Sequence, residues 1–213
     1  MRLDSIVPNQ DEEVGLHALG FESVAGLDEV GRGALAGPVV AAAVILPDFN
    51  QVEIESLWII RDSKQLSAKS RERANALIAQ IAVGTSVGMA SHDEIDRNGI
   101  VAATRLAMGR ALDELGPRPT HLLIDAMPLA WHNVPYKAIV GGDRLSTVIA
   151  AASIVAKVHR DALMVSLDKE YPGYGFANHK GYSTESHRNA INKLGASPIH
   201  RLTFAPLKPM LPL

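Results

Sequence analysis

The sequence predicts an α/β fold, in which helices pack on a mixed β-sheet and the C-terminal part is mostly helical. Strand candidates cluster early in the chain, and long helical patterns follow late. The run of Val, Ala and Ile from Val39 to Leu46 is typical of a strand buried on both faces of a sheet. At 213 residues the chain has the length of one domain, residues 1–213, of which about 171–213 form a C-terminal extension.

Turn and capping residues set the bounds of the expected elements. The strands are Val24–Asp28, Val39–Leu46, Val83–Ala90, His121–Asp125 and Pro135–Val140. A short helix around Val14–Leu19 lies in a polar lead-in, and further helices cover Ser67–Ile81, Gly99–Leu115, Leu145–Glu170 and Thr184–Leu194. Ser91 and Glu94 form a capping-box pattern. We expect a polar connection at Asp48–Gln65, a loop at Tyr171–Tyr182 and an irregular Pro-rich tail.

The composition excludes several classes of protein. The chain has no cysteine, which rules out a disulfide scaffold, a thiolate zinc site and a cysteine nucleophile. The start of the chain is acidic and polar, unlike a secretory signal. The longest apolar stretch, Gly33–Pro47, is short for a membrane span and contains two prolines. We therefore expect a soluble cytoplasmic protein without membrane contact.

Charge is distributed unevenly along the chain. Residues 1–125 hold 11 Lys+Arg and 18 Asp+Glu, and residues 126–213 hold 10 and 5, so the two parts carry −7 and +5. An acidic pocket can hold cations, and a basic surface can hold phosphates. The asymmetry suggests that such a pocket lies near such a surface, although chance clustering of surface charge gives the same counts.

Four acidic residues lie at expected strand ends or helix starts: Asp28, Glu29, Asp125 and Asp143. Adjacent acids are costly to bury unless a cation neutralises them, and Mg²⁺ and Mn²⁺ prefer oxygen ligands. Because side chains alternate along a strand, Asp28 and Glu29 can share a site only if the strand ends or bulges there. Each acid singly fits a solvated strand end, a turn or a helix cap. Together they favour a metal site, since ligands in open sheets bind outside strand ends.

A glycine-rich turn, Gly31-Arg32-Gly33, follows the acid pair after one residue, Val30. The spacing of Gly31, Gly33 and Gly37 misses the dinucleotide-binding pattern by one residue, and the sequence contains no G-K-[ST]. A nucleotide-cofactor site and a P-loop therefore lose support. The glycines would let backbone amides approach a ligand closely, with Arg32 near a phosphate, but a tight turn without a ligand fits equally well.

Further basic and hydroxyl side chains could complete a nucleic-acid site. Ser153 and Lys157 lie on the polar face of the helix predicted at 145–170, close to Arg160 and opposite the apolar face. Other candidates for phosphate contacts are Lys64 and Lys180, and Tyr182 offers a ring for stacking on a sugar or base. Ordinary solvation of the lysines and local packing of the tyrosine are the alternatives.

Taken in order, five segments resemble bacterial ribonuclease HII: AGLDEVGRGALAGPVVAAAVIL, DSKQLS, LLIDA, GGDRLSTVIAAASIVAKVHRD and YGFANHKGYST. The resemblance runs from about Val24 to Phe204. It implies a ribonuclease H-like fold, in which a mixed five-stranded sheet is flanked by helices and followed by a helical C-terminal part.

The resemblance also implies roles for the candidate residues other than Lys180. Four catalytic carboxylates would bind Mn²⁺ or Mg²⁺, with two ions in the catalytic complex: Asp28, Glu29, Asp125 and Asp143. The turn formed by Gly31, Arg32 and Gly33 would recognise the ribonucleotide 2′-hydroxyl at an RNA–DNA junction, and Tyr182 would sense that junction. Phosphate contacts would come from Lys64, Ser153 and Lys157. One departure is Gly141, where family members often have a lysine.

The implied activity is endonucleolytic hydrolysis of the RNA strand of RNA–DNA hybrids and cleavage on the 5′ side of ribonucleotides embedded in duplex DNA. It would leave 3′-hydroxyl and 5′-phosphate ends and serve ribonucleotide removal in DNA repair and replication, with the protein acting as a monomer. Two alternatives stay open. A junction resolvase or transposase core would share the acids without needing the Gly-Arg-Gly turn, and a non-catalytic RNA-binding module would use the acids only as helix caps.

Overall fold

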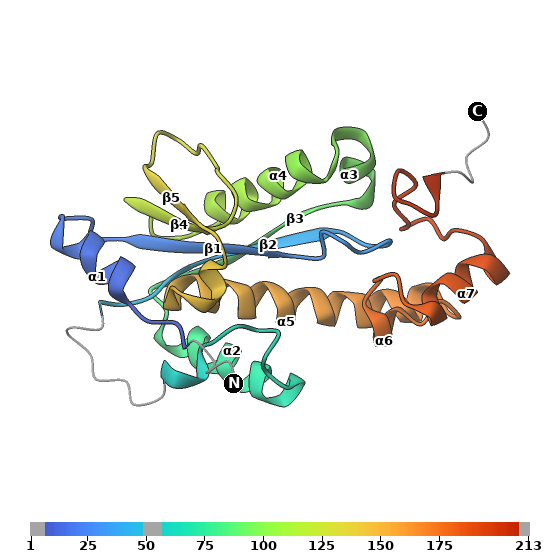
Figure 1. The fold of residues 1–213 in the computed structure, drawn as a ribbon, viewed down its shortest axis with the longest axis horizontal. Helices are drawn as coiled ribbons and strands as arrows, with labels where there is room; N and C mark the ends of the chain where they lie inside the picture. The colour runs from blue at the N-terminus through green and yellow to red at the C-terminus, as the bar shows by residue number, and fades with distance from the viewer. Residues whose placement is uncertain (1–6, 49–56, 209–213) are drawn as a thin grey trace, which may run out of the picture.

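A computed structural model describes residues 7–48 and 57–208 (Figure 1). Residues 1–6 of the lead-in, 49–56 of the polar connection and 209–213 of the Pro-rich tail lie outside the described residues. The strands are β1 (Val24–Val30), β2 (Val39–Ile45), β3 (Gly84–Ala90), β4 (His121–Asp125) and β5 (Tyr136–Ile139). They form one sheet in the order β3-β2-β1-β4-β5. Antiparallel pairs join β1, β2 and β3, and parallel pairs join β1, β4 and β5, which confirms the mixed five-stranded sheet.

Several of the helices begin after a residue whose side chain caps them. The helices are α1 (Asp11–Ala18), α2 (Ala68–Ile81), α3 (His92–Asn98), α4 (Ile100–Asp113), α5 (Thr147–Glu170), α6 (Phe176–His179) and α7 (Glu185–Leu194), with 3₁₀ turns η2 (Leu57–Ile59) and η3 (Gly142–Arg144). Ser67 and Thr184 accept hydrogen bonds from the first turns of α2 and α7, and Ser91 and Glu94 form the expected capping box. No helix in the described part of the chain is long and apolar enough to cross a membrane.

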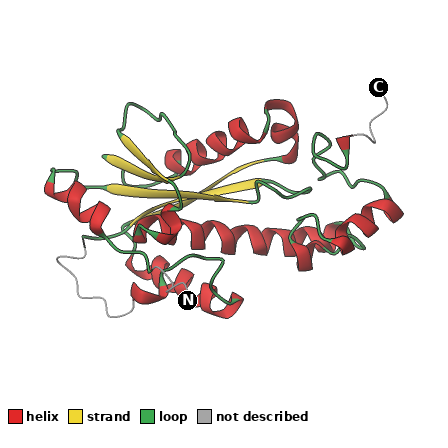
Figure 2. Cartoon of the chain, viewed as in Figure 1, coloured by secondary structure: helices red, strands yellow, loops and turns green. Residues whose placement is uncertain are grey.

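The sheet lies between two layers of helices, with α3 and α4 on one face and α2 and α5 on the other (Figures 1 and 2). Two glycines let the helices approach it closely. A Cβ on Gly88 of β3 would lie 2.1 Å from the carbonyl oxygen of Ala107 in α4. A Cβ on Gly26 of β1 would lie 2.4 Å from the carbonyl of Val148 in α5. The first turn of α5 therefore rests on β1, two residues before Asp28.

The C-terminal part extends beyond the strands at the far end of α5, where α6 and α7 lie (Figure 1). Met164 of α5 and Phe176 of α6 pack with Ala36 and Ile199 in a small apolar cluster. The expected loop at 171–182 thus contains a helical turn, α6, which sequence analysis missed because four residues carry no periodic signal. The tail from 195 to 208 contains no α-helix or β-strand in its described part, as expected.

The face of α5 predicted as polar is largely buried. Ser153 is 4% exposed and Arg160 is completely buried, so this face is not a solvated surface. The segment between β1 and β2 and the segment after α6 cover it, because both accept hydrogen bonds from Arg160. A polar stripe on a helix therefore marks internal polar contacts here rather than contact with water.

Candidate active site

The acid pair lies inside β1, which runs past it. Asp28 pairs with Ala42 and Glu29 with Ala41 in regular antiparallel register. The predicted end of the strand at Asp28 is therefore wrong, because β1 continues beside β2 through Val30. Side chains on a regular strand point to opposite faces, so Asp28 and Glu29 are linked here by their charges and not by a bulge. The other neighbour, β4, pairs only as far as Ile124, opposite Leu27. Its last residue, Asp125, is next in register to Asp28, on strands about 4.8 Å apart.

Asp28 is the most deeply buried of the β1 acids, with 5% of its surface exposed. Its Oδ1 accepts a hydrogen bond from the Glu29 amide at 2.7 Å, and the Ser153 hydroxyl also stabilises its charged form. Burial raises the pKa of Asp28 well above its usual value, and the charges of Glu29 and Asp125 raise it further. The acids of β1 and β4 therefore interact in one electrostatic cluster.

Glu29 has one satisfied and one unsatisfied carboxylate oxygen. Its Oε1 accepts a hydrogen bond from Arg32 Nη1 at 3.1 Å, whereas Oε2 is buried without a hydrogen-bond partner. Burial raises the pKa of Glu29, and the Arg32 guanidinium lowers it in part. A buried oxygen without a donor costs about 1–3 kcal/mol, and a bound cation would remove that cost.

Asp125 and Asp143 are joined through the turn before α5. The Gly142 amide donates to Asp125 Oδ1 at 2.7 Å, and Asp143 follows in η3 with 4% of its surface exposed. Burial raises the pKa of Asp125, the Gly142 hydrogen bond lowers it, and the charge of Asp143 raises it. Asp125 thus connects the β1 acids with the fourth carboxylate. The N-cap of α5 is Ser146 and not Asp143, so Asp143 has no capping role there.

The ligand set suits a hard divalent cation, since all four candidates are carboxylates. Within residues 7–48 and 57–208, however, no three Asp, Glu or His side chains converge as a ready-made metal cage. The protein's own cations explain part of this, because Arg32 holds Glu29 and Lys64 Nζ donates to Asp143 Oδ2 at 3.1 Å. The buried Oε2 of Glu29 has no hydrogen-bond donor, and a cation is a group that could satisfy it.

The Gly-Arg-Gly turn and Tyr182 lie together, although they are far apart in the sequence. Ala34, directly after the turn, forms an isolated β-bridge with Tyr182, and the Leu35 amide donates to the Gly181 carbonyl at 2.8 Å. Arg32 and Gly33 are exposed, whereas Gly31 is buried with φ +90°. The turn therefore presents its last two residues to solvent, beside the tyrosine.

The other candidate substrate-binding side chains differ in their exposure and in the partners that they already have. The Lys64 side chain is 76% exposed beside Asp143. Partial desolvation opposes its charge, but the hydrogen bond to Asp143 raises its pKa overall. Ser153 is hydrogen-bonded to Ser63 at 2.9 Å, and Lys157 is paired with Asp161 at 2.7 Å.

Lys180 is held locally, because it adopts a left-handed conformation with φ +53° and its ammonium donates to the Ala177 carbonyl. Among the lysines of residues 7–48 and 57–208, Lys64 alone forms an ion pair with one of the four acids. Beside Gly141, which has φ +69°, lies the Arg144 guanidinium, its Nη2 2.9 Å from the position of a Cβ. A positive charge thus stands next to the residue that departs from the family pattern.

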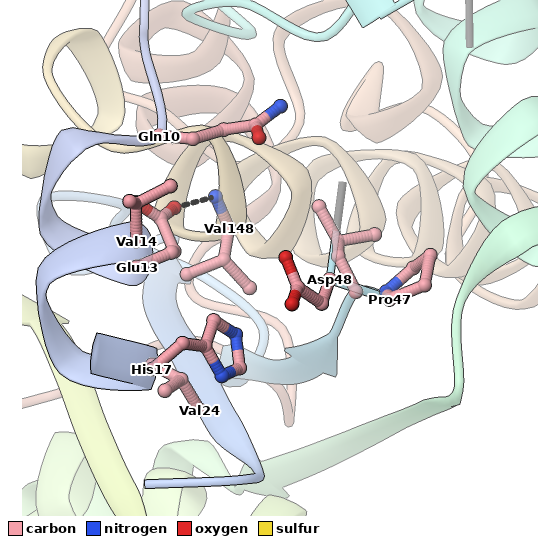
Figure 3. A pocket seen from close by; sticks show the side chains of 9 residues that line it. Gln10, Glu13, Val14, His17, Val24, Pro47, Asp48 and Val148 are labelled. Atoms are coloured by element: carbon pink, nitrogen blue, oxygen red, sulfur yellow. Dashed lines mark hydrogen bonds between the residues drawn. The ribbon is translucent and has the colours of Figure 1, made fainter. Parts of the chain in front are cut away.

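Sequence analysis missed the contribution of the lead-in. Glu13 of α1 accepts hydrogen bonds through Oε1 from the Ser146 hydroxyl and the Val148 amide, each at 2.8 Å. Figure 3 shows Glu13 at a small pocket where it reaches the start of α5. A carboxylate at a helix N-terminus is stabilising, so α1 helps fix the segment that carries Asp143. Only the acidity of the lead-in could have pointed to this contact.

Comparisons with known proteins identify the family of this chain. A sequence profile described as ribonuclease HII matches residues 25–207. A ribonuclease HII from Dehalococcoides mccartyi strain 195 is 49% identical over 208 residues, which cover 97% of each chain. The chain belongs to the ribonuclease HII family.

Solved structures of related enzymes share the fold. The ribonuclease H2 of Pyrococcus horikoshii OT3 matches with a TM-score of 0.73 and 26% identity, over 88% of this chain and 96% of that one. Bst-RNase HIII matches with a TM-score of 0.68 and 21% identity, over 94% and 72% of the two chains. As a member of the ribonuclease HII family, the protein is a metal-dependent endoribonuclease that cleaves the RNA strand of RNA–DNA hybrids.

Proposed function

We propose that this ribonuclease HII cuts on the 5′ side of single ribonucleotides embedded in duplex DNA, in addition to cutting hybrids, and leaves 3′-hydroxyl and 5′-phosphate ends. One observation carries the proposal: the exposed Arg32-Gly33 peptide follows the acid pair by two residues and lies beside Tyr182. The 2′-hydroxyl distinguishes RNA from DNA, so a backbone turn next to the acids is suited to recognise one ribose. Such an enzyme would serve ribonucleotide removal in repair and replication.

The acids proposed to hold the metal are Asp28, Glu29, Asp125 and Asp143. Bound Mg²⁺ or Mn²⁺, as two ions, would activate a water and stabilise the departing 3′-oxygen. The Mn²⁺ complex of Bst-RNase HIII supports this choice of ion. Without a cation these carboxylates repel a phosphodiester, and burial disfavours their charged forms, since it raises the pKa of Asp28, Glu29 and Asp125. Activity should therefore require a divalent ion.

The substrate is proposed to bind through groups around the acids. Lys64 is exposed at Asp143 and can move from that carboxylate to a phosphate. The Gly33 amide can donate to the 2′-hydroxyl, and the Tyr182 ring can stack on the sugar or base at the junction. Ser153, Lys157 and Lys180 are proposed as further phosphate contacts, of which the two lysines would have to leave their present partners.

The working unit is proposed to be a monomer in the cytoplasm, without a membrane partner. All four proposed metal ligands come from one chain, which supports a monomer. Its macromolecular partners would be the RNA–DNA hybrid and the ribonucleotide-containing duplex.

Cleavage of three duplexes of one sequence tests the proposal: all DNA, DNA with one ribonucleotide, and an RNA–DNA hybrid. We expect a single cut 5′ of the ribonucleotide and multiple cuts in the hybrid with Mg²⁺ or Mn²⁺, and no cut with EDTA. Cleavage of a four-way DNA junction instead would favour the resolvase alternative. Binding to RNA without any cleavage would favour the RNA-binding module.

A further inference from the structure

Two arginines are buried behind the Gly-Arg-Gly turn. Arg160 of α5 and Arg201 of the tail are each 0% exposed and are the largest completely buried side chains among the described residues. Neither forms a salt bridge with a described acidic side chain. Burial lowers the pKa of both, that of Arg201 to about 9, and the charge of Arg160 contributes to the shift of Arg201. Buried charges without a counter-ion are costly, so packing alone does not account for this pair.

Arg160 joins the segment after the turn to the segment before Tyr182. Its three nitrogens donate to the carbonyl oxygens of Pro38 (Nε, 3.0 Å), Lys180 (Nη1, 2.9 Å) and Ala36 (Nη2, 3.2 Å). Its guanidinium carbon lies 5.6 Å from the centre of the Tyr182 ring. A Cβ on Gly31 would lie 2.1 Å from Arg160 Nε, so the turn is built directly against this guanidinium. Arg160 thus contacts both parts of the proposed recognition surface.

Arg201 fixes the direction of the peptide inside the turn. Its Nε and Nη2 donate to the Gly37 carbonyl at 3.0 and 2.8 Å, and its Nη1 donates to the Arg32 carbonyl at 2.9 Å. In a trans peptide the carbonyl and the following N–H point in opposite directions. Because Arg201 draws the Arg32 carbonyl inward, the N–H of Gly33 is directed outward. Gly33 is exposed, and a Cβ there would meet nothing within 4 Å.

We propose that Arg160 and Arg201 are positioning residues for ribonucleotide recognition. They hold the Gly-Arg-Gly turn and Tyr182 in one arrangement and present the Gly33 N–H to the ribose 2′-hydroxyl. The planar guanidinium offers five donors in a rigid fork, whereas a lysine ammonium is a point charge that cannot span the same carbonyls. This inference rests on the proposed function, because it concerns how the turn distinguishes RNA from DNA.

The test compares Arg201→Lys with the wild type on two duplexes that differ by one ribonucleotide. We expect kcat/KM for cleavage at the ribonucleotide to fall at least 10-fold, since Gly33 loses its orientation. The Kd for the all-DNA duplex, which binds through phosphates, should stay within twofold. Arg110→Lys is the matched control, because Arg110 also donates to a carbonyl and to Glu94 but lies on α4. It should change neither quantity.

The proposal would be overturned if Arg201→Lys weakened all-DNA binding as much as it lowered kcat/KM at the ribonucleotide, or if it changed neither. The arginine would then not act on ribonucleotide recognition. Arg160→Lys is assayed in the same way. If neither variant folds, amide hydrogen exchange of the wild type without metal decides: the ribonucleotide duplex should protect the Gly33 amide more than the all-DNA duplex does. Equal protection would contradict the proposal. Failure of the proposed function would appear separately, as wild-type protein that leaves the ribonucleotide duplex uncut.

Discussion

The acid pair lies on β1 and the Gly-Arg-Gly turn follows the end of that strand, yet the two regions differ in how their charged groups are satisfied. In the acid site, burial raises the pKa values of Asp28, Glu29 and Asp125, and Glu29 Oε2 has no hydrogen-bond partner. Behind the turn, each nitrogen of Arg160 and Arg201 donates to a backbone carbonyl. The first region leaves a buried carboxylate oxygen without a donor, whereas in the second the guanidinium nitrogens are satisfied by backbone carbonyls. Substitutions in the two regions should therefore change stability with opposite signs.

The largest expected effect is the loss of activity in Asp28→Asn. The change removes a proposed metal ligand, and we expect cleavage of the ribonucleotide duplex to fall at least about 1,000-fold, as removal of a main catalytic group does. The same variant should unfold at a higher temperature without metal, because an unfavourable buried charge is gone. Cleavage assays and thermal unfolding with EDTA check both. Near-normal turnover, or a less stable metal-free protein, would contradict the account of the acid site.

Gly31→Ala should lose both stability and activity. Its φ of +90° disfavours any residue with a Cβ, and that Cβ would lie 2.1 Å from Arg160 Nε. We expect a loss of about 3 kcal/mol in the free energy of unfolding, from strain together with overpacking. Denaturant unfolding measures it. The control is Gly33→Ala, because a Cβ at Gly33 would meet nothing within 4 Å. It should lower the free energy of unfolding by well under half as much. Equal losses in the two variants would show that the Arg160 guanidinium does not constrain the turn.

The pH dependence of stability separates the two regions further. The pKa of Asp28 in the folded protein is raised above its usual value of 3.8, so the folded state binds a proton more tightly than the unfolded state does. Near pH 4 and below, the charge of Asp28 contributes little to the stability of the fold. As the pH rises, the ionised carboxylate increasingly destabilises the fold. The stability difference between Asp28→Asn and the wild type, both in EDTA, should therefore grow from pH 4 to pH 8. If the stability difference between the two proteins stayed constant over this pH range, the charge of Asp28 would not destabilise the fold.

The smallest effect concerns the lead-in. Glu13→Ala removes the acceptor for Ser146 and Val148 at the start of α5 and should cost about 1 kcal/mol, the usual contribution of a helix cap. Glu13→Gln keeps an acceptor oxygen and should cost less than half of that. Denaturant unfolding of the pair checks the order. If both variants match the wild type, α1 does not support the segment carrying Asp143.

Much of the fold followed from local signals in the sequence. Ser67, Ser91 and Thr184 begin helices where their hydroxyls predicted it, and the apolar run at 39–46 forms a fully buried strand. The strand bearing the acid pair was predicted too short, because acids usually end a buried strand. Here β2 continues to pair with it through Val30.

The site was predicted in part, for reasons that lie in its chemistry. The four acids were chosen from their place at strand ends and from the family resemblance, and the structure links them through register and mutual charge effects. Arg160 was assigned only to a polar helix face, and Arg201 was not singled out. Both act through backbone carbonyls, and a carbonyl leaves no trace in the residue types of a sequence.

The central claim is that carboxylates from three separate segments form one site for a divalent ion. Calorimetric titration of Mn²⁺ at pH 7 into the wild type, Asp125→Asn and Asp143→Asn tests it most directly. The account predicts that each substitution weakens Mn²⁺ binding at least 10-fold, because each removes an oxygen ligand and a negative charge. Mn²⁺ affinity within twofold of the wild type in either variant would show that this carboxylate stands outside the metal site.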